Sequence, residues 1–239
     1  MLANSSTVTH LAIIPDGNRR WAKQNGLLAI QGHKKGFDIV EPVVRRAFDL
    51  GVRYISVWAF STENWKRSEE EVSYLMDIYT SLINDNGRRL GEEGFRFVVS
   101  GQRRQLPEKL IKAIEEIEAN TKDNIKGTVN LCLNYGGHQE LIDAANKALR
   151  TFRSGGGGGV GEFNEEVFRQ NLYQELPDID LIIRTSGEKR LSGFMPWLGS
   201  YSELVFFDKH WPAFLPEDID SALAEFAKRN RTIGGDSKS

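Results

Sequence analysis

Six short apolar runs separated mostly by helical patterns place the strongest constraint on how this chain folds. The runs cover residues 10–14, 54–60, 95–99, 128–133, 180–183 and 204–207. Apolar runs of about four to eight residues, bounded by turn-forming residues, are typical of strands buried on both faces. Because strands alternate with helices, we predict one α/β domain whose six-stranded, mostly parallel sheet is flanked by helices.

Helical spacing of apolar residues fills most of the gaps between these runs. One pattern covers 33–50, where Pro42 predicts a kink or a later helix start. Ser68 and Glu71 form a capping pair that opens the helix after the second run. Further helices are expected at 107–119, 139–152, 164–176 and 216–229.

The chain of 239 residues shows no internal repeat and no sign of a second domain. A run of five glycines, residues 155–159, predicts a flexible surface loop. Residues 1–8 and 232–239 are expected to be flexible tails of the single domain that spans residues 1–239.

Composition excludes several classes of protein. Lys and Arg total 31 against 33 Asp and Glu, so no global basic field exists to hold nucleic acid. The single cysteine, Cys132, excludes an internal disulfide and a cysteine-rich zinc site, and it fits a reducing, cytoplasmic location. We recognise neither a signal peptide at the N-terminus nor an apolar run long enough to span a bilayer.

Three polar clusters follow predicted strands, where ligands of open α/β sheets bind. The first is Asp16-Gly17-Asn18-Arg19-Arg20-Trp21, in which a helix start and two arginines favour an anion. Asp16 would repel a bare phosphate, which indicates a bridging Mg²⁺. The alternative is a helix-capping aspartate beside solvated arginines.

The second and third clusters follow the second and fifth strands. Residues 61–67 hold hydroxyls, an acid, an amide, an indole and two cations; the alternative is a solvated turn that leads into the capped helix. Residues 184–192 place Arg184, Arg190 and Ser192 on a glycine-containing segment that suits a diphosphate. The alternative there is a surface loop in which Arg190 pairs with Glu188.

Taken together, two cationic clusters and two carboxylates, Asp16 and Glu203, all expected at one sheet edge, suit two diphosphates and one Mg²⁺. His33, beside two lysines, is expected to bind a phosphate oxygen, although it could simply cap its helix. No GxGxxG motif follows a predicted strand, and the sequence contains neither a P-loop motif nor a nucleophile elbow.

Successive motifs along nearly the whole chain resemble those of the cis-prenyltransferases, the undecaprenyl diphosphate synthase family. They read HLAIIPDGNRRWA, GHKKG, WAFSTENWKR, LNYGG, DLIIRTSGEKRLSGF and SYSELVFFDKHWPAF, in the family's order. Asn18-Arg19-Arg20 and Leu191-Ser192-Gly193-Phe194 are closest in detail to archaeal and eukaryotic members.

The resemblance implies a homodimeric, Mg²⁺-dependent transferase of isoprenoid biosynthesis. It would condense isopentenyl diphosphate onto an allylic diphosphate (farnesyl, geranyl or geranylgeranyl) and make each new double bond cis. The expected product is a polyprenyl diphosphate of C30 or more, which would grow into an apolar tunnel. The lipid product implies peripheral contact of a cytoplasmic enzyme with membranes.

Site roles also follow from the resemblance, position by position. Asp16 would be the essential carboxylate and, with Glu203, a metal ligand; Asn64 would be the family's proton acceptor, although we expect the departing diphosphate to take the proton and Asn64 to orient it. The remaining residues would bind substrate: Gly17, Asn18, Arg19, Arg20, Trp21, His33, Ser61, Thr62, Glu63, Trp65, Arg67, Arg184, Arg190, Leu191 and Ser192.

Product length is the least determined property. Small Ala59 is expected to leave the tunnel open, and the expected lining is Leu75, Ile78, Leu82, Val98 and Val129, each of which could equally be ordinary core. Two of the family's usual arginines are replaced, by Ala29 and Thr232. The alternatives are a synthase of short or irregular products and a non-catalytic partner subunit, which the complete set of site residues disfavours.

Overall fold

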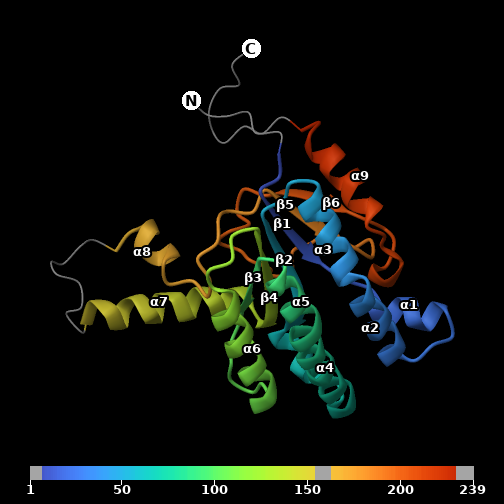
Figure 1. Cartoon of the computed structure of the whole chain (residues 1–239), viewed down its shortest axis with the longest axis horizontal. Helices are drawn as coiled ribbons and strands as arrows, with labels where there is room; N and C mark the ends of the chain where they lie inside the picture. Colours follow the sequence, from blue (N-terminus) through green and yellow to red (C-terminus); the bar gives the residue numbers. More distant parts are fainter. Residues whose placement is uncertain (1–6, 154–162, 230–239) are drawn as a thin grey trace.

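An all-parallel sheet of six strands lies at the centre of the molecule, in the order β3-β4-β2-β1-β5-β6 (Figure 1). The computed structural model describes residues 7–153 and 163–229. The predicted sheet is thus confirmed, with every pairing parallel. Its strands are β1 (His10–Ile14), β2 (Tyr54–Ser61), β3 (Phe95–Ser100), β4 (Gly127–Tyr135), β5 (Leu181–Arg184) and β6 (Glu203–Phe206).

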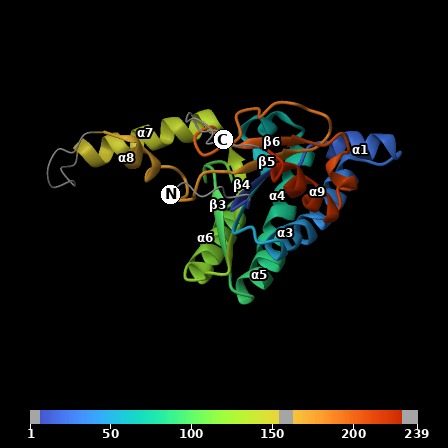
Figure 2. The same ribbon diagram turned by 90° about the horizontal axis from the view of Figure 1, so that it is seen from above.

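Helices cover both faces of the sheet (Figure 2). Those before β4 are α1 (Asn18–Gln24), α2 (Ala29–Asp38), α3 (Val40–Asp49), the 3₁₀ helix η1 (Thr62–Lys66), α4 (Glu69–Leu82), the π-helical turn η2 (Ile83–Gly87), α5 (Arg88–Glu92) and α6 (Glu108–Thr121). Those after it are α7 (Gly137–Arg153), α8 (Glu165–Arg169), the 3₁₀ helix η3 (Trp211–Ala213) and α9 (Glu217–Phe226). Within the described ranges, no helix combines the length and the apolar character needed to cross a membrane.

Alternation along β1 divides the core between the two faces. Leu11 and Ile13 join a large cluster with α3, α4, α6 and α9, whereas Ala12 and Ile14 join a smaller cluster with α7 and the segment after α8. All five residues of β1 are buried, as expected for a parallel strand covered by helices on both sides.

One prediction about the helices is confirmed and another is wrong. The 33–50 pattern is divided into α2 and α3, so the helix start expected near Pro42 is present; Pro42 lies in the first turn of α3, where its missing N–H costs nothing. The 164–176 helix is only α8: Asn164 caps it as expected, but after Arg169 the Asn171 side chain donates to the Val167 carbonyl at 2.8 Å, and the chain continues in tighter turns. The glycine run 155–159 and most of both predicted tails lie outside the described residues.

A chain of buried polar side chains crosses four strands of the sheet. His10 on β1 contacts Ser56 on β2 at 2.9 Å, Asn130 on β4 donates to Ser56 at 2.9 Å, and Ser100 on β3 donates to Asn130 at 2.8 Å. The other His10 ring nitrogen lies 2.8 Å from the Pro177 carbonyl. Each of these buried groups therefore has a partner, and together they fix how the four strands are aligned.

Burial lowers the pKa of His10 to about 4, so its neutral form is favoured in the fold. Between pH 6.5 and 4 the unfolded chain binds this proton and the folded chain does not. The free energy of unfolding should therefore fall by about 3 kcal/mol from this group as the pH drops through that window. Denaturant unfolding at several pH values should show a shallower pH dependence for His10→Gln than for the wild type. His138→Gln, at an exposed histidine, is the control, and an unchanged pH dependence in His10→Gln would contradict the assignment.

Candidate active site

Asp16 and Arg184 lie together at the point where the strand order of the sheet reverses. The chain leaves β1 toward β2 on one side and later places β5 on the other side of β1, so a crevice opens at the carboxyl ends of β1 and β5. Asp16 follows β1, Arg184 ends β5, and Arg184 Nη2 donates to Asp16 Oδ2 at 3.0 Å. Thr185 fixes the backbone of Asp16 by accepting from its N–H at 2.9 Å and donating to its carbonyl at 2.7 Å.

Arg184 is a buried cation held from several sides. Its side chain is 6 % exposed, and its Nη1 donates to the Arg190 carbonyl at 2.5 Å and to Ser192 Oγ at 3.0 Å. Its Nε is buried and has no partner within the described part of the chain. A buried charge of this kind needs opposing charge, which Asp16 supplies in part.

Glu188 links two further arginines of the site. Arg20 donates to Glu188 at 2.8 Å and to Asp16 at 3.1 Å, and Arg190 also pairs with Glu188. Arg190 and then Arg20 hold the pKa of Glu188 below its usual value, so Glu188 is charged at neutral pH. The pairing of Arg190 with Glu188 that we considered from the sequence is therefore present, on an exposed Arg190 side chain, and Arg20 connects it to Asp16.

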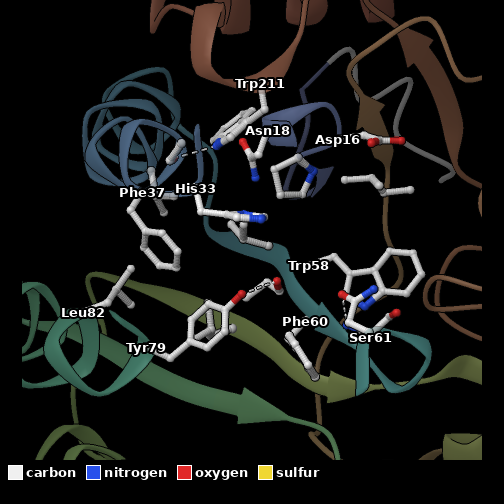
Figure 3. Close-up of a pocket in the computed structure, with 18 of the residues that line it drawn as sticks. Asp16, Asn18, His33, Phe37, Trp58, Phe60, Ser61, Tyr79, Leu82 and Trp211 are labelled. Atoms are coloured by element: carbon white, nitrogen blue, oxygen red, sulfur yellow. Dashed lines mark hydrogen bonds between the residues drawn. The ribbon is translucent and has the colours of Figure 1, made fainter. Parts of the chain in front are cut away.

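Gly17 lets the chain after β1 approach its neighbours closely. Its φ of +102° lies in the left-handed region, and a Cβ there would lie 2.5 Å from Ser186 Oγ and 2.7 Å from His210 Nδ1. Asn18 follows at the start of α1, and its buried Oδ1 has no partner in the described chain. Asn18 lines the cavity with Asp16 (Figure 3).

His33 lines the same cavity, but its partner is a carboxylate that the sequence did not single out as a site residue. His33 Nε2 lies 3.1 Å from Glu71 Oε1, and Arg67 donates to that oxygen at 3.1 Å. Burial, and then the Arg67 charge, lowers the pKa of His33. Arg19 lies at the edge of this group, 4.0 Å from Glu71. Glu71 therefore brings together three predicted substrate-binding residues, whereas the sequence marked it only as a helix cap.

The cluster after β2 is a short helix and not a plain loop. Ser61, Asn64 and Arg67 line the cavity, and the Ser61 backbone N–H donates to Asn64 Oδ1 at 3.1 Å. Trp65 packs edge-on against Phe60, with ring centroids 5.2 Å apart. The other predicted residues lie off the cavity wall: Trp65 itself, Thr62, exposed Glu63, and from the other clusters Gly17, Trp21, Arg19, Arg20, Arg190 and Leu191.

The cavity is polar at its mouth and apolar inside, with a volume of about 240 Å³. Tyr79 crosses its inner part, where the hydroxyl donates to the Ala59 carbonyl at 2.6 Å (Figure 3). Of the five residues expected to line a tunnel, only Leu82 lines this cavity, while Leu75 and Val129 belong to the core. The apolar wall includes Phe37, Val40, Val57, Phe60, Leu82 and Leu131.

Glu203 corrects the prediction that both candidate metal ligands lie at one edge. It is the first residue of β6 and pairs with Leu181, the first residue of β5, whereas Asp16 lies beyond the last residue of β1. In a parallel sheet these positions are at opposite ends of the strands. Glu203 instead forms an ion pair with Arg229 at 2.7 Å.

Asp16 alone therefore remains as the candidate metal ligand of this cavity. No group of three or more His, Cys, Asp or Glu side chains able to hold a metal occurs in residues 7–153 and 163–229. Mg²⁺ characteristically binds through one or two carboxylates together with substrate phosphates, not in a cage of protein ligands. A partly exposed carboxylate beside two arginines, Arg184 and Arg20, fits that mode.

Comparison with known proteins gives the class to which this fold and site belong. A family model described as "Putative undecaprenyl diphosphate synthase" matches residues 14–234. An isoprenyl transferase of Thermotoga maritima is 44 % identical over 227 residues, which cover 95 % of this chain and 96 % of that protein. The isoprenyl transferase of Listeria innocua is also 44 % identical and covers 95 % of this chain and 90 % of its own length.

A solved structure shares the whole fold. Lavandulyl diphosphate synthase from Lavandula x intermedia, in complex with dimethylallyl diphosphate, superposes with a TM-score of 0.91 at 33 % identity, over 97 % of this chain and 100 % of that one. The chain is thus a transferase of the prenyl diphosphate synthase class. It belongs to the undecaprenyl diphosphate synthase family of cis-prenyltransferases.

Proposed function

We propose that this enzyme elongates a prenyl chain by condensing isopentenyl diphosphate onto an allylic diphosphate, with each new double bond cis. The observation that carries the proposal is the cavity, whose mouth holds arginines and Asp16 and whose interior is apolar. Such a cavity matches an amphipathic substrate with a charged diphosphate head and a hydrocarbon tail. The product would be a polyprenyl diphosphate of C30 or more.

The allylic diphosphate would lie at the start of α1. There the Gly17–Asn18 backbone and Arg20 face Asp16, and the N-terminal amides of a helix favour an anion. Mg²⁺ held by Asp16 and the diphosphate would stabilise the negative charge of the leaving group. Arg20 would supply charge-assisted hydrogen bonds to the same oxygens.

The isopentenyl diphosphate would bind to Arg184, Arg190 and Ser192. The Arg184–Ser192 hydrogen bond of 3.0 Å already presents these two side chains as one surface. Holding the alkene against the allylic carbon is an orientation task, and orientation of two bound reactants accounts for much of the rate enhancement in such reactions.

Asn64 would orient the proton transfer that completes each condensation. As the allylic C–O bond breaks and the new C–C bond forms, the isopentenyl unit must lose a proton. A neutral amide is a weak base, so the departing diphosphate would take the proton while Asn64 holds the reacting groups in place. Asn64 faces the cavity and is held by its bond to Ser61.

A synthase of short or irregular prenyl diphosphates is the second candidate. Its support is the TM-score of 0.91 with lavandulyl diphosphate synthase and a cavity of only about 240 Å³. The sizes and structures of the products formed from a panel of allylic primers distinguish the two candidates.

We further propose that the enzyme is a homodimer that acts in the cytoplasm and contacts membranes through its lipid product. Exposed apolar side chains on α7, at Ile142, Leu149 and Phe152, support an interface there, and α7 extends away from the sheet (Figure 1). Sedimentation equilibrium measures the assembly directly.

The similarity of the motifs at residues 18–20 and 191–194 to those of archaeal and eukaryotic members stays a prediction.

Asp16→Asn should lower turnover per folded molecule by about a hundredfold or more, because the change removes charge from the site but keeps a hydrogen-bond acceptor. Incorporation of labelled isopentenyl diphosphate into an allylic primer measures turnover, and EDTA should stop it until Mg²⁺ is restored. Asp123→Asn, at an exposed aspartate, is the control. Wild-type turnover in folded Asp16→Asn, or no incorporation by the wild type with any primer, would overturn the proposal.

Arg190→Ala should raise the KM for isopentenyl diphosphate about ten- to a hundredfold and change the KM for the allylic primer far less. A lost charge-assisted hydrogen bond of this kind is worth about 1.5–3 kcal/mol. Lys189→Ala removes a neighbouring exposed cation and should change neither KM value. Equal changes for both substrates in Arg190→Ala would mean that the two diphosphate sites are wrongly assigned.

Ala59→Leu should shorten the products while the first condensation stays close to normal. Ala59 lines the cavity beside Tyr79, and a larger side chain there cannot be absorbed without about 1–3 kcal/mol of strain. Chromatographic sizing of products from one primer compares the wild type, Ala59→Leu and the small-residue control Ala59→Gly. An unchanged distribution in Ala59→Leu, or a wild type that stops at C15, would show that Ala59 does not control product length.

A further inference from the structure

The end of β4 contains a bulge at Asn134. Phe60 and Ser61 are consecutive on β2, but they pair with Leu133 and Tyr135, so Asn134 is an extra residue in the ladder. Its φ of +49° lies in the left-handed region, which asparagine tolerates better than most residues. Bulges often re-aim a side chain next to an active site. The LNYGG motif that contains Asn134 has no role in the function proposed above.

The Asn134 amide is buried, and every part of it is used. Its Oδ1 accepts a hydrogen bond from the Trp65 indole N–H at 2.8 Å. Its Nδ2 donates to the carbonyls of Gln102, at 3.0 Å, and Arg104, at 2.9 Å. Two carbonyls require the donor end and the indole requires the acceptor end, so the orientation of the amide is determined.

The same turn contacts η1 at a second point. A Cβ built on Gly136 would lie 2.6 Å from Thr62 Oγ1, so Thr62 rests directly against the Gly136 backbone. Asn64, which lies between Thr62 and Trp65 in the sequence of η1, faces the cavity. The contacts at Trp65 and Thr62 therefore hold η1 on either side of Asn64.

We propose that Asn134 is a positioning residue for prenyl transfer, which seats η1 on the end of β4 and so fixes Asn64 against the bound substrates. This proposal rests on the proposed function. Asn134 itself is not on the cavity wall, so its effect on the reaction passes through Trp65. Reacting groups are sensitive to misplacement of about 1 Å, which can cost a hundredfold in rate.

Three variants separate this role from a purely structural one. Trp65→Phe removes only the indole donor at a half-buried residue, and Asn134→Gly removes the amide while tolerating the positive φ. Asn124→Gly is the matched control, because Asn124 Nδ2 likewise donates to two backbone carbonyls, those of Gly91 at 2.7 Å and Phe95 at 2.9 Å, away from the cavity.

Steady-state kinetics per folded molecule give the first readout. In Asn134→Gly and in Trp65→Phe, kcat should fall about tenfold or more, with each KM changed less than about threefold. The kcat of the double variant should lie within about twofold of the kcat of the poorer single variant, because both substitutions remove the same contact. Asn124→Gly should lower the melting temperature without changing kcat. Unchanged kcat in Trp65→Phe, or strictly additive losses, would overturn the proposal.

Hydrogen exchange of residues 61–67 without substrate gives the second readout and does not depend on turnover. Exchange there should speed up about tenfold in Asn134→Gly and Trp65→Phe and stay unchanged in Asn124→Gly. Equal exchange in the wild type and all three variants would show that Asn134 does not hold η1 on the end of β4. If Asn134→Gly does not fold, Trp65→Phe decides the matter alone. A wild type without prenyl transfer would reject the proposed function, while the exchange data would still show whether Asn134 holds η1.

Discussion

The ion pair between Asp16 and Arg184 is the interaction on which the site depends. It joins the ends of β1 and β5, with 3.0 Å between Arg184 Nη2 and Asp16 Oδ2, at the point where the strand order of the sheet reverses. Because Arg184 is buried, loss of its carboxylate partner would leave an uncompensated charge inside the protein. Asp16 also contacts Arg20, and Arg184 holds Ser192 and the Arg190 backbone, so both candidate diphosphate sites are arranged around this one pair.

The strands and most helices follow from patterns within single segments, which is why the sequence predicts them. Buried parallel strands such as β1 read as continuous apolar runs, and the Ser68–Glu71 cap marks the start of α4. The helix predicted at 164–176 ends early: the Asn171 side chain donates to the Val167 carbonyl, and the backbone N–H groups of Asn171 and Leu172 donate to carbonyls three residues back. The apolar pattern of that segment continues past this point and so overestimates the length of the helix.

The site is most readily predicted where residues follow a strand directly. Asp16 and Arg184 were found because the carboxyl ends of neighbouring parallel strands meet at one edge. Glu203 was misplaced although its position at the start of a strand already implied the opposite edge. Glu71 was missed as a site residue because its contacts with His33 and Arg67 appear only in the folded chain, and its pattern with Ser68 marked it as a helix cap. Asn134 was missed because its partner Trp65 is distant in sequence.

The Glu188 bridge has a consequence for the energetics of ligand capture. Arg20 and Arg190 both form ion pairs with Glu188, so each of these cations already has a counterion. Under the proposed function, an arriving diphosphate would therefore take part in an exchange, in which arginine–phosphate bonds form as arginine–carboxylate bonds break. The net gain would be the difference between two interactions, so affinity at this mouth would depend on geometry and on hydrocarbon contact inside the cavity as well as on charge. Release would be eased in the same way, because Glu188 could replace each departing phosphate oxygen as the partner of the two arginines.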